Sequence, residues 1–191
     1  MLTRILFPAI LSVCMLLSAC HSSELKKNEP LPPAPSAGGD FSALETNLAH
    51  DTGNTELRLL LASKYYAAGD LDRATDLYYQ VYKKDNTIQT ALINLGNIAY
   101  DRHQDDKAIA YYEKALETDS LNLDVRCDLA TCYANVSKLN KAIEILRFNI
   151  RTDPNHIKSH YNLSVILQKK GELKEAEDEL KIYNTLLADK K

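Results

Sequence analysis

The chain has 191 residues, of which 45% are hydrophobic and 26% are charged. This composition is typical of one folded domain with tails, and it excludes a disordered chain or a multi-span membrane protein. Lys and Arg total 23 against 26 Asp and Glu, a net charge of −3, which disfavours a nucleic-acid binder because such proteins cluster positive charge. The four Cys and five His predict neither a disulfide framework nor a multi-cysteine zinc site.

Residues 1–19 are predicted to be a secretion signal. Arg4 precedes an apolar run that is shorter than the about 20 residues a membrane-spanning helix needs. The run ends in LSAC at residues 17–20, which resembles the lipobox of bacterial lipoproteins. In that family the cysteine thiol is lipidated and the chain is cut just before it, so the resemblance implies a lipid anchor on Cys20. An ordinary signal peptide with a chance cysteine is the alternative.

The residue after Cys20 is His21, whereas Asp at this place favours inner-membrane retention in lipoproteins of Gram-negative bacteria. The lipoprotein resemblance therefore implies a protein anchored to the bacterial outer membrane and facing the periplasm. In a Gram-positive cell the same anchor would leave it at the cell surface.

Residues 20–40 are predicted to be a disordered, partly polyproline tether. This segment holds four of the six prolines, has Gly38-Gly39 near its end, and has too few apolar side chains to pack. Fully extended, it would reach about 60 Å and would hold a folded module away from the bilayer.

From Thr55 onward the sequence repeats every 34 residues, in four units that need no insertion: 55–88, 89–122, 123–156 and 157–190. Three kinds of position keep the period, namely a leucine, a small residue after it, and an alanine. They are Leu61, Leu95, Leu129 and Leu163; Ala62, Gly96, Ala130 and Ser164; and Ala74, Ala108, Ala142 and Ala176. This pattern resembles the tetratricopeptide repeat (TPR), which implies an all-α, right-handed solenoid of four helix-turn-helix units.

Helical periodicity supports this fold independently. Positions 7, 8 and 11 of a unit share one face of a first helix, and positions 20, 24 and 27 share one face of a second. The small residue at position 8 and the alanine at position 20 let the two helices approach closely. The units depart from the family pattern in places: Pro154 is the only proline at position 32, and Asn149 and Tyr183 replace alanine at position 27.

The two ends of the array need cover, because a repeat is stable only when stacked on a neighbour. Residues 41–54 are predicted to contain an N-terminal capping helix that covers the first unit with Leu44 and Leu48. At the other end, Leu180, Tyr183 and Leu187 must be covered. We expect Lys and Glu stems to do this, with docking or self-association through the C-terminal helix as the alternative.

No set of residues predicts catalysis, and no metal or cofactor is expected. His156 and His160 are four apart but lie in HIKSH rather than HExxH, so we expect structural roles for both. Cys127 and Cys132 lie about 140° apart around one predicted helix, which predicts buried free thiols rather than a disulfide or metal pair. The sequence has no Gly-rich phosphate loop and no nucleophile elbow, so we expect no enzyme.

The TPR resemblance implies a concave peptide-binding groove lined by the first helices. Asparagines there could pair with an extended peptide backbone, and tyrosines could offer contact area at small entropic cost. The lysine-based carboxylate clamp of chaperone-binding TPR proteins is absent, and Asp124 and Asp128 disfavour an acidic ligand. That these side chains are ordinary repeat filler is the alternative. The predicted groove residues are Leu59, Ser63, Tyr66, Ile93, Asn94, Asn97, Tyr100, Asp128, Thr131, Tyr161, Asn162 and Val165.

Together these features predict a non-catalytic, membrane-anchored TPR lipoprotein that acts as a protein- or peptide-binding scaffold in the cell envelope. Its partners would be a protein segment on the concave face and the membrane through its lipid, with no nucleic acid. Two alternatives remain: a pilotin-like assembly factor for an outer-membrane secretion or pilus complex, and an accessory subunit of an envelope enzyme system for cell-wall remodelling or cytochrome maturation.

Overall fold

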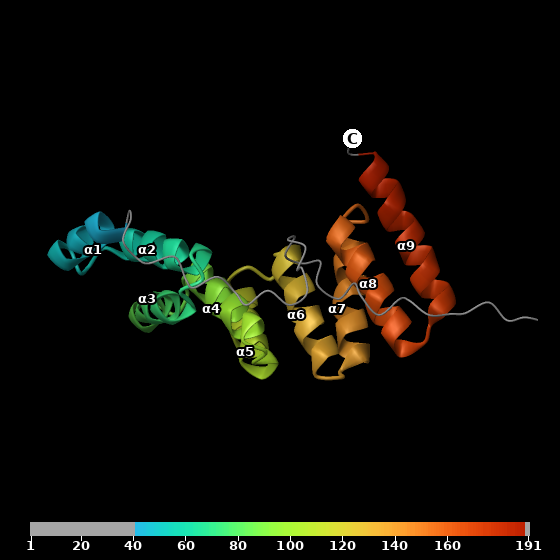
Figure 1. Ribbon diagram of the computed structural model, residues 1–191. Helices are drawn as coiled ribbons and strands as arrows, with labels where there is room; N and C mark the ends of the chain where they lie inside the picture. Colours follow the sequence, from blue (N-terminus) through green and yellow to red (C-terminus); the bar gives the residue numbers. More distant parts are fainter. Residues whose placement is uncertain (1–40, 190–191) are drawn as a thin grey trace, which may run out of the picture.

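The computed structural model describes residues 41–189, so the predicted signal peptide, Cys20 and the tether lie outside the described residues. Between residues 41 and 189 the chain forms nine α-helices and no strand. They are α1 (Phe41–His50), α2 (Thr55–Ala67), α3 (Leu71–Lys84), α4 (Gln89–Asp101), α5 (Asp105–Thr118), α6 (Leu123–Asn135), α7 (Leu139–Thr152), α8 (Ile157–Lys170) and α9 (Leu173–Ala188). They form an elongated array with α1 and α9 at opposite ends (Figure 1). Within this range no helix has the length and apolar character needed to span a membrane.

The helices keep the 34-residue register of the sequence. Each predicted unit begins at the first residue of a helix, since α2, α4, α6 and α8 start at residues 55, 89, 123 and 157. The four periodic leucines occupy equivalent interior places, with exposed fractions of 2%, 2%, 5% and 1% along the chain. The prediction of an all-α TPR solenoid is therefore confirmed.

The turn inside each unit depends on one residue with left-handed backbone geometry. Position 15 has a positive φ in all four units: 78° at Gly69, 56° at His103, 63° at Ser137 and 90° at Gly171. Glycine adopts this geometry without a steric penalty, whereas a residue with a β-carbon is strained there. The backbone bend is thus shared by all units although only two of them supply a glycine.

Side chains cap several of the helices. Asn54 accepts a hydrogen bond from the backbone N–H of Leu57 at 2.9 Å, and Asn122 accepts one from Val125 at 3.1 Å. At α3 the cap is Asp70, which accepts the backbone N–H of Arg73 at 3.1 Å. These bonds satisfy N–H groups that have no partner within their own helix.

The N-terminal cap forms as predicted. The Phe41 ring stacks on the Tyr65 ring with centroids 4.8 Å apart, and Leu44 and Leu48 pack against the core of the first unit. The helix α1 thus takes the place that the second helix of a preceding unit would occupy.

The C-terminal end is covered less completely. Of the 16 residues of α9, Ala176 alone is buried. Leu173, Leu180 and Leu187 are 64%, 42% and 41% exposed. The expected Lys and Glu stems therefore do not close over this end of the array.

Candidate peptide-binding face

The twelve predicted groove residues lie on the first helices of the four units, and we refer to them as the first-helix face. The helices α2 and α8 supply three residues each, α4 supplies four including Tyr100, and α6 supplies two. Most are half-buried, which leaves part of each side chain open to a partner. Ser63 is exposed, whereas Asn162 is only 6% exposed and offers little surface.

Tyr66 is held by the following unit. Its hydroxyl donates a hydrogen bond of 2.8 Å to the carboxylate of Asp101, which lies at the end of α4. Burial raises the pKa of Tyr66, and the bond to Asp101 raises it further, so the phenol is neutral. The ring is therefore oriented before any partner arrives, which lowers the entropic cost of binding.

The two asparagines of α4 each use one group within the protein. The side-chain NH₂ of Asn94 donates to the Thr90 carbonyl at 2.8 Å. The side-chain oxygen of Asn97 accepts the hydroxyl of the buried Tyr112 at 2.8 Å. The core thus fixes the direction of the Asn97 amide, which the sequence pattern did not indicate.

The downstream half of the first-helix face differs from the prediction at one residue. The Tyr161 ring packs against Tyr183 of α9, with centroids 5.1 Å apart. Tyr183 stands at position 27, where the family has alanine. Its large ring covers part of Tyr161, so only the rest of the Tyr161 ring can contact a partner. On α6, the Thr131 hydroxyl donates to the Cys127 carbonyl at 3.0 Å.

The histidines serve separate structural contacts. One ring nitrogen of His156 lies 2.8 Å from the Ser159 hydroxyl. His160 is 3% exposed; its Nε2 donates to the Pro154 carbonyl at 2.9 Å and its Nδ1 lies 2.6 Å from a Glu179 oxygen. In the described part of the chain, no three His, Cys, Asp or Glu side chains gather as metal ligands would.

Cys127 and Cys132 are both fully buried thiols, as predicted, and neither forms a disulfide within the described residues. Burial raises the pKa of the Cys132 thiol, so it is protonated and unreactive at neutral pH.

A buried polar cluster between the third and fourth units was not foreseen. Asn149 of α7 is fully buried and donates to the Ser159 hydroxyl at 3.1 Å and to the Leu123 carbonyl at 2.9 Å. The Cys127 sulfur lies 3.3 Å from the same hydroxyl. Asn149 at an alanine position was the visible signal, because a buried amide needs polar partners.

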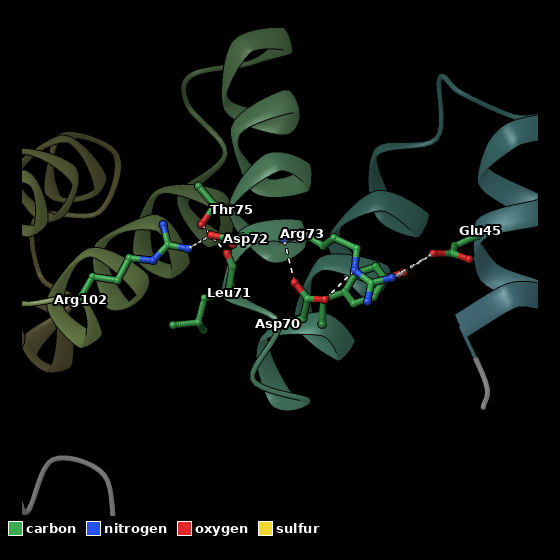
Figure 2. Close-up of polar contacts among 8 residues, drawn as sticks. Glu45, Asp70, Leu71, Asp72, Arg73, Thr75 and Arg102 are labelled. Atoms are coloured by element: carbon green, nitrogen blue, oxygen red, sulfur yellow. Dashed lines mark hydrogen bonds and ion pairs between the residues drawn. The ribbon is translucent and has the colours of Figure 1, made fainter. Parts of the chain in front are cut away.

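Ion pairs also link successive second helices. Glu45 pairs with Arg73 at 3.9 Å, Glu113 with Lys141 at 3.4 Å, and Arg147 with Glu175 at 2.6 Å, each across 28 residues. Figure 2 shows Arg73 between Asp70 and Glu45, and shows Arg102 of the second unit reaching Asp72 of the first. Opposite charges 28 residues apart were the sequence signal for these contacts.

A concavity of about 400 Å³ lies between α1, α2 and α3. Arg58, 8% exposed, lines it together with Leu48, Leu61 and Leu77, and donates a hydrogen bond to the Thr52 carbonyl. The sequence pattern did not indicate this concavity, because it depends on how α1 meets the first unit.

Comparisons with known proteins agree with the repeat architecture. Residues 101–182 match the family model of the anaphase-promoting complex (cyclosome) subunit 3. Human protein O-mannosyl-transferase TMTC3 is 30% identical over 106 residues, which are 54% of this chain and 12% of that protein. Tetratricopeptide repeat protein 8 of Caenorhabditis elegans is 23% identical over 128 residues, which are 66% of this chain and 25% of that protein. The chain therefore spans a quarter or less of these relatives.

Solved structures resemble the whole array. A crystal structure of MamA has a TM-score of 0.73 at 23% identity, and the match covers 78% of this chain and 88% of that one. MamA from Desulfovibrio magneticus RS-1 has a TM-score of 0.73 at 20% identity, covering 78% and 84%. At these identities the likeness shows the fold alone.

The stacked helical hairpins and the regular first-helix face define a scaffold of helical repeats, a class whose members bind other proteins. Within that class the chain has the fold of a tetratricopeptide repeat array and is similar in sequence to proteins that carry such repeats.

Proposed function

We propose that this protein is a non-catalytic adaptor, anchored by lipid to the bacterial cell envelope, that binds a protein or peptide segment on its first-helix face. The observation that carries the proposal is the Tyr66–Asp101 hydrogen bond, because it fixes a half-buried aromatic ring on that face across a unit boundary.

The chemistry of this face favours an extended, uncharged or basic segment. Tyr66 and Tyr100 supply apolar area with a polar edge, and Asn94 lies on the same helix as Tyr100. Asp101 and Asp128 add negative charge, which disfavours an acidic ligand. A rigid array of helices loses little entropy when such a segment docks.

The anchor and the location follow from the lipobox resemblance at residues 17–20. With Cys20 lipidated at the outer membrane, the tether would hold the array in the periplasm. Metabolic labelling with a palmitate analogue tests this, since Cys20→Ser should abolish the label and leave the protein unanchored. If the Cys20→Ser variant kept the label, Cys20 would not be the site of lipid attachment.

The partner is tested by cross-linking in intact envelopes, followed by affinity capture of the full chain. Tyr66→Ala combined with Tyr100→Ala should reduce capture of the principal partner at least tenfold while helicity and thermal midpoint stay close to wild type. The matched control is Tyr79→Ala, which removes a 44% exposed ring from α3, a second helix outside the first-helix face.

Equal capture by the double variant and the wild type would show that the first-helix face is not the binding surface. The identity of the captured protein decides between a general adaptor and the two alternatives. A single secretion or pilus component would indicate an assembly factor, and an envelope enzyme would indicate an accessory subunit.

A further inference from the structure

The outer flank of α9 carries a stripe of exposed leucines. Leu173, Leu180 and Leu187 recur every seven residues, so they stay within about 40° of one another around the helix. They are 64%, 42% and 41% exposed. Because the helix rises about 1.5 Å per residue, the stripe is about 21 Å long.

The other units bury the position that Leu180 occupies. Position 24 is Tyr78, Tyr112 and Leu146 in the first three units, and these are 1%, 2% and 0% exposed. In α9 the same position is 42% exposed. Leu180 is therefore an apolar residue at a position that is buried in the other three units but exposed in α9.

The opposite end of the array does not complement this stripe. Among the described residues, none of the large exposed apolar side chains lies on α1, whose exposed residues include Ser42, Glu45 and Thr46. Head-to-tail stacking of two copies would therefore place leucines against a polar helix. An open-ended chain of copies is disfavoured for this reason.

The stripe does complement itself. In an antiparallel pair of α9 helices centred on Leu180, each Leu173 meets Leu187 of the second copy and the two Leu180 side chains meet each other. Glu177 and Lys181 lie on the same side of the stripe, the side away from the buried Ala176. The same two-fold axis brings Glu177 of each copy within reach of Lys181 of the other, so the charges beside the stripe are complementary.

We propose that the protein forms a two-fold symmetric dimer through α9, with the two helices antiparallel and Leu180 at the axis. The inference stands apart from the proposed function, because it involves neither the first-helix face nor the lipid anchor. The dimer would present two first-helix faces and two tethers from one assembly.

Sedimentation of the purified full chain in mild detergent tests the association. Wild type should sediment as a dimer at micromolar concentration, and Leu180→Glu should sediment as a monomer with unchanged helicity. The matched control is Ile182→Glu, which alters a 41% exposed residue about 200° away around the same helix and should leave the dimer intact. A monomeric wild type, or equal dissociation by both variants, would overturn the proposal.

Disulfide trapping tests the orientation. Leu180→Cys should form a disulfide-linked dimer on mild oxidation, above any background in wild type. Leu173→Cys should not link to itself, because the two sulfurs would stand about 21 Å apart. A mixture of Leu173→Cys and Leu187→Cys should link. Self-linking of Leu173→Cys as efficient as that of Leu180→Cys would indicate parallel helices and contradict the antiparallel dimer.

Discussion

Gly96 and Tyr112 lie so close together that the position of a β-carbon on Gly96 falls 2.6 Å from the edge of the Tyr112 ring. Gly96 lies on the first helix of the second unit and Tyr112 on the second. The ring is buried and its hydroxyl is bonded to Asn97, so it cannot easily move aside. The small residue of this unit is therefore required to be glycine.

Gly96→Ala should lower the stability of the array. Overpacking costs about 1–3 kcal/mol, whereas alanine in a helix regains about 1 kcal/mol, so we expect a net loss. Urea unfolding measures it. Tyr112→Leu makes room, since leucine occupies this place in the third unit, and the double variant should lose less than the two single variants combined. A strictly additive double variant would show that the two residues do not clash.

Asn149→Ala should destabilise the junction between the third and fourth units. It removes the amide that donates to Ser159 and to the Leu123 carbonyl, at a cost of about 1–3 kcal/mol for the buried hydrogen bonds lost. Adding Ser159→Ala removes the other partner and should recover part of that loss. Chemical unfolding of all four chains checks the coupling. If the double variant loses as much stability as the two single variants added together, the two side chains act independently.

The stability of the protein should fall in alkali as buried tyrosines ionise. Burial raises the pKa of Tyr78 from about 10 to about 12. The folded chain therefore keeps this proton to higher pH than the unfolded chain, and the stabilisation is complete below pH 10 and lost as pH rises toward 12.

Tyr78→Phe should flatten the dependence of unfolding free energy on pH in that window. Burial also raises the pKa of Tyr66 and Tyr112, so a smaller slope should remain. The matched control is Tyr79→Phe, on the same helix but 44% exposed. Equal flattening by the two variants would rule out burial at Tyr78 as the cause.

Reversing one charge between α7 and α9 should cost little. Arg147 and Glu175 pair at 2.6 Å, but both side chains are nearly half exposed. Glu175→Lys should lower stability by less than about 1 kcal/mol, and by less still in high salt. Combining it with Arg147→Glu should restore the thermal midpoint. Asp178→Lys changes the net charge equally and controls for that effect; a loss unaffected by salt would point to packing instead.

The repeat register was readable from the sequence because close helix packing restricts residue size. The periodic leucines that begin with Leu61 and the periodic alanines that begin with Ala74 are buried, as expected. Few other residue types fit in these places. The cap by Leu44 and Leu48 was also predictable, because their spacing places them on one face of a helix. The predicted lipid anchor at Cys20 and the first-helix face as a binding surface stay predictions.

Other features depended on tertiary structure. The period showed which helices pack against each other. It did not show the partner of each polar group, because a hydrogen bond depends on the direction of the side chain and on the position of its atoms to within about 1 Å. The Tyr66–Asp101 bond, the Asn149 cluster and the Tyr161–Tyr183 contact belong to this group. That helical hairpins stack at a constant interval follows from residue size and apolar spacing, which can be read along the chain. The polar contacts on the faces of the stack and the leucines left exposed on α9 arise only when the helices pack together, because they depend on which side chains meet in space.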